Sequence, residues 1–124
     1  MRKTLVCVIC PNGCHVEAEV QERGGRLEVL EVTGALCKKG ERWVRQEVVE
    51  PLRTISSSVL VEGGDFPLVS VRTDSPIPLD SIFRVMDEVK RARVRAPVSI
   101  GQVIISNPAG TSCNIIATRM VNPA

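Results

Sequence analysis

The sequence predicts an α+β protein, with a small β-hairpin cysteine lobe followed by a lobe of about four strands and one helix. Several short runs alternate apolar and polar residues, which is the period of a strand, whereas only two segments have helical spacing. Val, Ile and Leu must build the core because only 2% of the residues are aromatic, and this composition favours strands. The 124 residues are enough for one domain or two small lobes.

The first predicted element is a β-hairpin around Gly24-Gly25. Apolar residues alternate with polar ones on both sides of this turn, as in a hairpin with one buried face. If the turn is centred between the two glycines, the numbers of paired residues sum to about 49. The residues expected to face inward are Val16, Ala18, Val20, Leu27, Val29 and Val32.

A short helix is predicted over residues 41–49, with Trp43, Val44 and Val48 facing inward. Pro51 cannot continue a helix and ends it. We therefore divide the chain near residue 50, into a four-cysteine metal- or cluster-binding lobe at 1–50 and an α+β lobe at 51–124 that supplies a docking surface.

The second lobe is predicted to hold four strands and one helix. Asp80 is placed to cap the helix, and the basic run at 90–95 is expected to end it, where cations complement the helix dipole. A docking site for an acidic partner is the alternative role of that run. The strands are expected at 54–62, 66–73, 96–106 and 114–120, and the helix at 81–93.

Four of the five cysteines have the spacing Cys-x2-Cys-x3-Cys-x22-Cys, at Cys7, Cys10, Cys14 and Cys37. The long gap is spanned by the predicted hairpin, whose register puts Cys37 opposite Asn12, between Cys10 and Cys14. The four sulfurs are therefore expected to converge. The fifth, Cys113, is expected to be a small buried hydrophobe rather than a ligand.

Four converging thiolates suit either a [4Fe–4S] cluster or Zn²⁺. Structural zinc sites usually take two sulfurs from each of two short knuckles, whereas three ligands here come from one loop and the fourth from far along the chain. This division favours the cluster, and a structural or interaction module stabilised by zinc on the four cysteines is the alternative. A reversible thiol–disulfide sensor, for example at Cys7 and Cys10, is a third hypothesis.

Composition excludes several other classes. The net charge of +2 and the scarcity of aromatic residues argue against nucleic-acid binding. There is no segment that resembles a signal peptide or a membrane span, so a cytoplasmic protein without membrane insertion is expected. No nucleophile–base pair or nucleotide-binding fingerprint stands out, and the single histidine, His15, is expected to have no ligand role. The chain is therefore not expected to be an enzyme on its own.

Residues 5–53 resemble the N-terminal [4Fe–4S] domain of molybdopterin oxidoreductases. The resemblance rests on the four cysteines, on Gly25-Arg26-Leu27, on the Cys-x-Lys-Gly motif at 37–40 and on the Pro-Leu-Arg stretch at 51–53. In those enzymes the motif lysine, here Lys39, lies between the cluster and the pterin. The resemblance implies that Lys39 belongs to the cofactor-binding set, and a solvated surface lysine is the alternative. The chain is too short to hold the pterin-binding domains.

The whole sequence, including the stretches at 69–78, 96–104 and 114–119, is similar to a small uncharacterised bacterial and archaeal family. Members of that family are encoded beside an FAD-dependent protein resembling glycerol-3-phosphate dehydrogenase and a flavin-containing pyridine-nucleotide oxidoreductase. This resemblance implies an iron–sulfur electron-transfer subunit of a flavin-dependent oxidoreductase.

Overall fold

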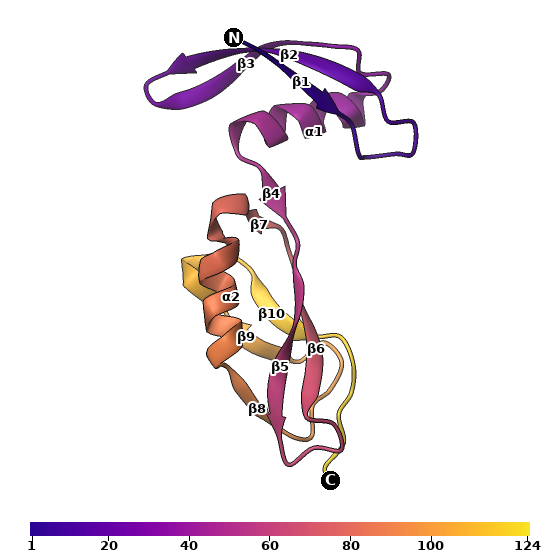
Figure 1. The fold of residues 1–124 in the computed structure, drawn as a ribbon, viewed down its shortest axis with the longest axis vertical. Coiled ribbons are helices and arrows are strands. Elements are labelled where there is room, and N and C mark those ends of the chain that lie inside the picture. Colours follow the sequence, from indigo (N-terminus) through magenta and orange to yellow (C-terminus); the bar gives the residue numbers. More distant parts are fainter. The chain divides into compact units, whose positions relative to one another are not determined.

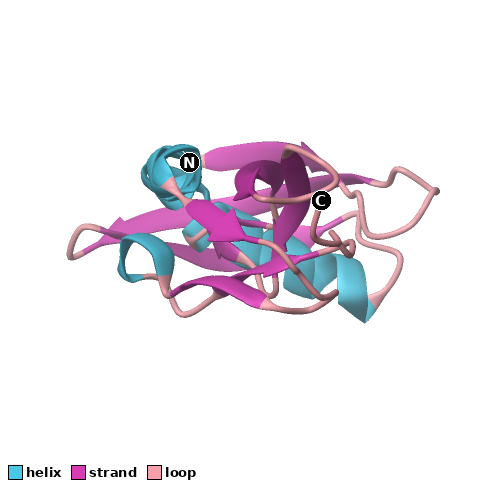
Figure 2. Cartoon of the chain, turned by 90° about the horizontal axis from the view of Figure 1, so that it is seen from below, coloured by secondary structure: helices cyan, strands magenta, loops and turns pink.

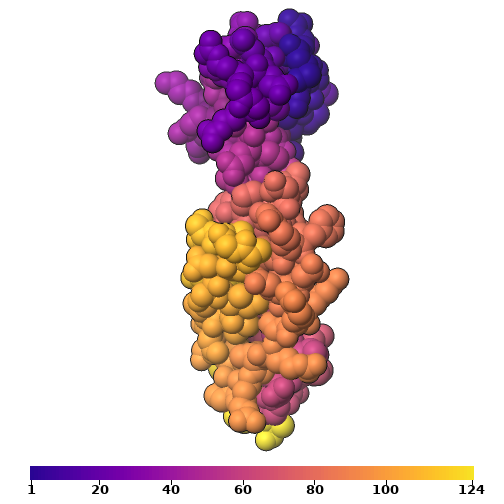
Figure 3. Space-filling model, turned by 90° about the vertical axis from the view of Figure 1, so that its left-hand side faces the viewer, coloured from indigo at the N-terminus to yellow at the C-terminus, as the bar shows by residue number.

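The computed structural model describes residues 1–124 and divides them into two compact units, Met1–Pro51 and Leu52–Ala124. The colours of Figures 1 and 3 follow the sequence, so the first unit runs from indigo to magenta and the second continues to yellow. Ten strands and two α-helices form the chain, and the predicted α+β class is confirmed (Figure 2). Neither helix is long and apolar enough to cross a lipid bilayer.

The first unit is an antiparallel three-stranded sheet with one helix against one of its faces (Figure 1). The sheet has the order β1-β2-β3, with β1 at Arg2–Val6, β2 at His15–Arg23 and β3 at Arg26–Thr33. Helix α1 spans Lys38–Val49 and begins three residues before its predicted start. Strands β2 and β3 and helix α1 were predicted from the sequence, whereas β1 was not. Its pairing with β2 runs from Arg2–Glu19 to Val6–His15.

The register of the predicted hairpin is confirmed on the side of the turn. The pairs from Arg23–Arg26 to Val20–Val29 sum to 49, and beyond them the pairing shifts by one residue, so that Glu19 pairs with Glu31. Leu30 is the extra residue of this bulge, and 53% of it is exposed. The bulge explains why Val29 and Val32, three positions apart, both pack on the core despite the two-residue period of a strand.

The core of the first unit lies between the sheet and α1. Its fully buried members come from the alternating positions of β2 and from one face of α1. Half-buried Trp43 packs against this core, as predicted for the inward face of the helix. The buried residues are Cys7, Val16, Ala18, Val20, Val44 and Val48.

The second unit is built on a five-stranded sheet with the order β8-β5-β6-β10-β9. All neighbouring strands are antiparallel except β5 and β8, which are parallel. Helix α2, at Ile82–Arg91, packs Val85 and Val89 into a core with the buried valines of β5 and β6. The strands of this sheet are β5 at Ser56–Glu62, β6 at Leu68–Thr73, β8 at Arg93–Arg95, β9 at Val103–Ser106 and β10 at Asn114–Ala117. A separate two-stranded sheet pairs β4 at Leu52–Arg53 with β7 at Ile77–Pro78.

Three details of the second lobe were predicted wrongly. Asp80 does not cap α2, because it lies in a 3-10 turn over Leu79–Ser81, and the N-cap residue is Ser81. Only Lys90 and Arg91 of the basic run end the helix, since Arg93–Arg95 form strand β8. The strand predicted at 96–106 is confined to Val103–Ser106.

Candidate metal centre

The first three cysteines lie on the loop that joins β1 to β2. The ladder between these strands ends at the pair Val6–His15, and the next hydrogen bond runs from the backbone N–H of Cys7 to the carbonyl of Cys14, at 2.8 Å. Gly13, with φ +61°, supplies the left-handed bend just before Cys14. The loop is thus closed at its base, with Cys7 and Cys14 side by side and Cys10 between them in sequence.

Cys37 is the N-cap residue of α1. Its backbone is extended, with φ −147° and ψ 161°, and its Sγ accepts a hydrogen bond of 3.4 Å from the N–H of Gly40. The first N–H groups of a helix have no partner within the helix and carry partial positive charge. The Sγ of Cys37 therefore lies at the N-terminus of α1, where negative charge is favoured.

The route from β3 to Cys37 depends on Gly34. Its φ is +90°, and a Cβ added there would collide with the backbone carbonyl oxygen of His15 on β2. The tight approach ends the β2–β3 ladder, whose last pair is Glu17–Thr33. The predicted position of Cys37 opposite Asn12 is therefore wrong in detail, because Cys37 lies beyond the ladder and begins a helix.

The sulfurs of Cys7 and Cys37 both lie close to Gly40. A Cβ added to this buried glycine would lie 3.2 Å from the Sγ of Cys7 and 3.9 Å from the Sγ of Cys37. Because both sulfurs are this close to one point, they lie within about 7 Å of each other. A side chain at residue 40 would occupy the space that the two sulfurs face.

The four cysteines differ in exposure and in how closely they gather. Cys7 is buried, Cys14 is half-buried, and Cys10 and Cys37 are exposed. All are free thiols, and no group of three or more His, Cys, Asp or Glu side chains is arranged to hold a metal ion. The structure thus brings the sulfurs of Cys7 and Cys37 together through Gly40, and joins Cys14 to Cys7 through the backbone.

The other residues singled out in the sequence lie in different places. Lys39 is exposed in the first turn of α1, and His15 is exposed at the start of β2. Cys113 is buried in the core of the second unit, as predicted, with its Sγ 3.3 Å from the hydroxyl of Thr111. Sequence reasoning missed the N-cap role of Cys37 and the space at Gly40, because a cysteine followed by two lysines is not a usual capping sequence.

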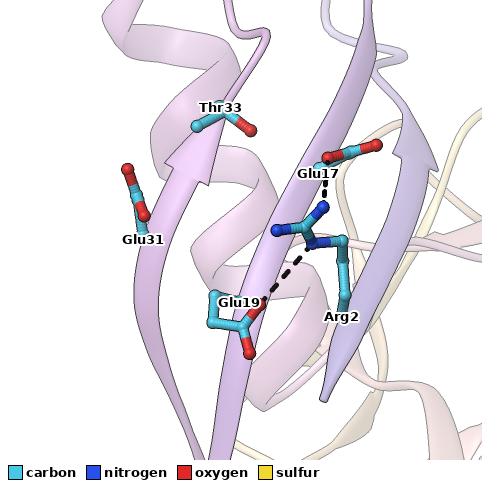
Figure 4. A pocket seen from close by; sticks show the side chains of 5 residues that line it. All are labelled: Arg2, Glu17, Glu19, Glu31 and Thr33. Atoms are coloured by element: carbon cyan, nitrogen blue, oxygen red, sulfur yellow. Dashed lines mark ion pairs between the residues drawn. The ribbon is translucent and has the colours of Figure 1, made fainter.

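An acidic hollow lies on the first sheet (Figure 4). Arg2 lies between two of its carboxylates, 3.4 Å from Glu17 and 3.6 Å from Glu19, and Glu31 and Thr33 complete the lining. These ion pairs are half-exposed, so each contributes little to stability. The hollow contains no cysteine.

Comparisons with known proteins gave a match to one protein family and to one solved structure. No curated protein matches the chain. An NMR structure of the Clostridium perfringens protein CPE0013, a structural-genomics target, is similar in fold, with 22% identity and a TM-score of 0.54 over 59% of this chain and 87% of that one.

A family model described as "Protein of unknown function (DUF1667)" matches residues 38–119, more than half of the chain. The match begins one residue after Cys37, so it includes Lys39 and Cys113 but none of the four clustered cysteines. On this match, the chain belongs to the uncharacterised DUF1667 family.

Proposed function

We propose that this chain is an electron-transfer subunit that carries one [4Fe–4S] cluster on Cys7, Cys10, Cys14 and Cys37. The observation that carries the proposal is the approach of Cys7 and Cys37, thirty positions apart, to the same face of Gly40. Both thiols border the space that the missing side chain of Gly40 leaves open. The backbone hydrogen bond from Cys7 to Cys14 holds a third cysteine of the set beside Cys7 in the loop.

The donor set suits an iron–sulfur cluster. It consists of thiols alone, and a single loop carries three of them, which can wrap the separate iron corners of a cubane. Cys7 forms the buried side of the site, whereas Cys10 and Cys37 lie at the surface. A group held there is anchored on the core and still close to solvent, where a partner can reach it.

The residues around the sulfurs would tune the site. The N–H of Gly40 donates to the Sγ of Cys37, and the α1 N-terminus directs its dipole at the same atom. Hydrogen bonds and positive potential at a cluster sulfur favour the more negative state, so both raise the reduction potential. Lys39, in the first turn of the helix, adds a positive charge nearby.

The bound cluster would accept and release single electrons. A flavin-dependent dehydrogenase or pyridine-nucleotide oxidoreductase subunit is the partner we propose, as the family resemblance described above implies. Flavins exchange electrons with one-electron carriers, and this chain has no flavin-binding fingerprint of its own. The chain would then act as an accessory subunit and not as an enzyme alone.

Iron, sulfide and zinc stoichiometry on protein purified without oxygen tests the proposal. We expect about four irons and four sulfides per chain, broad brown absorbance, and an EPR signal after reduction. One tightly bound zinc without iron or sulfide would instead assign a structural module with four thiolate ligands, whose first unit a chelator should unfold.

Two variants locate the site. Cys37→Ser keeps a residue that caps helices well and removes only the thiolate, so α1 should persist while iron content falls sharply. Cys113→Ala is the matched control in the other core and should leave the iron content unchanged. Equal iron in the Cys37→Ser and Cys113→Ala proteins would contradict the assigned ligands.

A further inference from the structure

Large apolar side chains are exposed directly beside the clustered cysteines. Val8 is 70% exposed, Ile9 is 46% exposed and Leu36 is 79% exposed. Val8 and Ile9 lie between Cys7 and Cys10, and Leu36 precedes Cys37. Gly40 brings the sulfurs of Cys7 and Cys37 within about 7 Å, so these three exposed side chains each lie within two positions of one of two neighbouring sulfurs.

The two segments that carry these side chains have basic residues and no acidic ones. Residues 1–16 and 32–40 contain no Asp or Glu, and exposed Lys38 and Lys39 follow Cys37 directly. The nearest acidic residue along the helix, Glu41, forms an ion pair with Arg45, at 3.2 Å, in the next turn. The two lysines also occupy the first turn of α1, where the helix dipole disfavours cations.

We propose that Val8, Ile9, Leu36, Lys38 and Lys39, together called the cysteine rim, form the docking surface for an acidic protein that exchanges electrons with the cysteine site. The inference rests on the proposed function and names the surface and the charge of the partner. Apolar residues at the centre of a small patch with cations at its edge are typical of transient protein contacts, in which charge guides the encounter.

A protein partner suits the rim better than an anionic membrane. Lipid-binding basic segments use clusters of four to eight Lys or Arg residues, whereas the rim contributes two. Electron exchange also requires the partner's redox centre to come close to the sulfurs, and every rim residue lies within two positions of a site cysteine. We therefore assign this docking surface to the first unit. It is separate from the docking surface that the sequence predicts for the lobe at 51–124.

Electron transfer from the full, cluster-loaded chain to two forms of one acceptor tests the inference. Native cytochrome c is basic, and succinylated cytochrome c carries the same haem on an acidic surface. After reduction with dithionite and its removal, each cluster gives one electron and each haem iron goes from ferric to ferrous. Stopped-flow rates are recorded from about 20 to 500 mM salt, a range over which surface charges become screened.

We expect the acidic acceptor to react faster than the basic one at low salt, and its rate to fall as salt rises. Lys38→Glu with Lys39→Glu should slow it about tenfold at low salt and remove most of the salt dependence. Leu36→Ser should slow it at every salt concentration. The control, Arg23→Glu with Arg26→Glu at the β2–β3 turn, makes the same charge change on exposed residues at the end of β2 opposite the cysteine loop and should alter the rate less than twofold.

Three outcomes would overturn the inference. An equal effect of the control pair would show that only net charge matters, and unchanged rates in the rim variants would remove the docking role. Sedimentation with phosphatidylserine vesicles that depends on Lys38 and Lys39 would assign the rim to a membrane. Iron analysis of each sample separates these results from failure of the proposed function.

Carbodiimide cross-linking gives a readout that needs no cluster. It joins lysine amines to carboxylates of a bound protein, so Lys38 and Lys39 should link to succinylated cytochrome c in preference to Lys90. Cross-links spread evenly over all lysines would count against the rim even in a sample that lacks iron.

Discussion

Gly40 occupies a helix position where alanine would ordinarily be better. Glycine within a helix costs about 1 kcal/mol relative to alanine, because it loses more backbone freedom on folding. Here the missing side chain leaves space for the sulfurs of Cys7 and Cys37. Helix propensity and the space at the site thus make opposite demands on this residue.

Gly40→Ala separates those two demands. The new Cβ would lie 3.2 Å from the Sγ of Cys7, so we expect lower iron content or a displaced reduction potential in anaerobically purified protein. Arg42→Ala, at an exposed position of the same helix, is the control and should keep its iron. If Gly40→Ala gained stability and kept full iron and an unchanged potential, the space at Gly40 would have no role.

The four-cysteine set was visible in the sequence, but the part that each residue plays was not. Spacing predicted that Cys37 returns to the first three cysteines, and the structure brings it to Cys7. It did not predict that Cys37 caps a helix, because cysteine is not among the preferred N-cap residues. The close approach of the Cys7 and Cys37 sulfurs to Gly40 depends on tertiary packing, and no local sequence pattern predicts it.

At the scale of elements, the β2–β3 hairpin delivers Cys37, and Gly34 determines where the hairpin ends. Clear alternation and the Gly24-Gly25 turn predicted the register near the turn. The bulge at Leu30 was not predicted, because its only trace in the sequence is that the apolar residues Val29 and Val32 are three positions apart and not two. Strand β8 was missed because Arg93 and Arg95 belong to the basic run that was expected to end the helix.

Gly34→Ala should destabilise the first unit more than Gly24→Ala does. Both glycines have positive φ, where a Cβ costs roughly 1–2 kcal/mol. At Gly24 that Cβ meets nothing within 4 Å, whereas at Gly34 it collides with the His15 carbonyl. Chemical denaturation followed by Trp43 fluorescence, which reports on the first unit alone, measures the difference. Equal losses in the two variants would mean that the close approach to β2 is unimportant.

At the scale of the whole molecule, each unit has its own core, so we expect the two units to differ in their free energies of unfolding. The first core surrounds Val44 and the second surrounds Val85, and each of these residues is fully buried. Periodicity predicted the buried residues that β2 and α1 contribute to the first core, whereas the strand residues of the second core were not predicted. The order of the strands in the five-stranded sheet could not be predicted, since it depends on pairings between segments far apart in the chain.

Val85→Ala should therefore weaken the second unit without affecting the metal centre. Loss of two buried methyl groups is expected to lower the free energy of unfolding of that unit by about 2 kcal/mol. Hydrogen exchange of β6 amides should accelerate, while exchange in β2 and the iron content stay constant. Val44→Ala is the reciprocal variant, and parallel losses in both units would show that they unfold as one.

The capping of α1 by Cys37 has a consequence for how the protein is made. The hydrogen bond from Gly40 and the closed β1–β2 loop involve protein atoms alone, so the newly synthesised chain can complete its first unit before any iron is at hand. If the proposed cluster is bound, its insertion can therefore follow folding, from the side where Cys10 and Cys37 are exposed. Supply of iron and sulfur would then limit the active pool of this protein without limiting its folding.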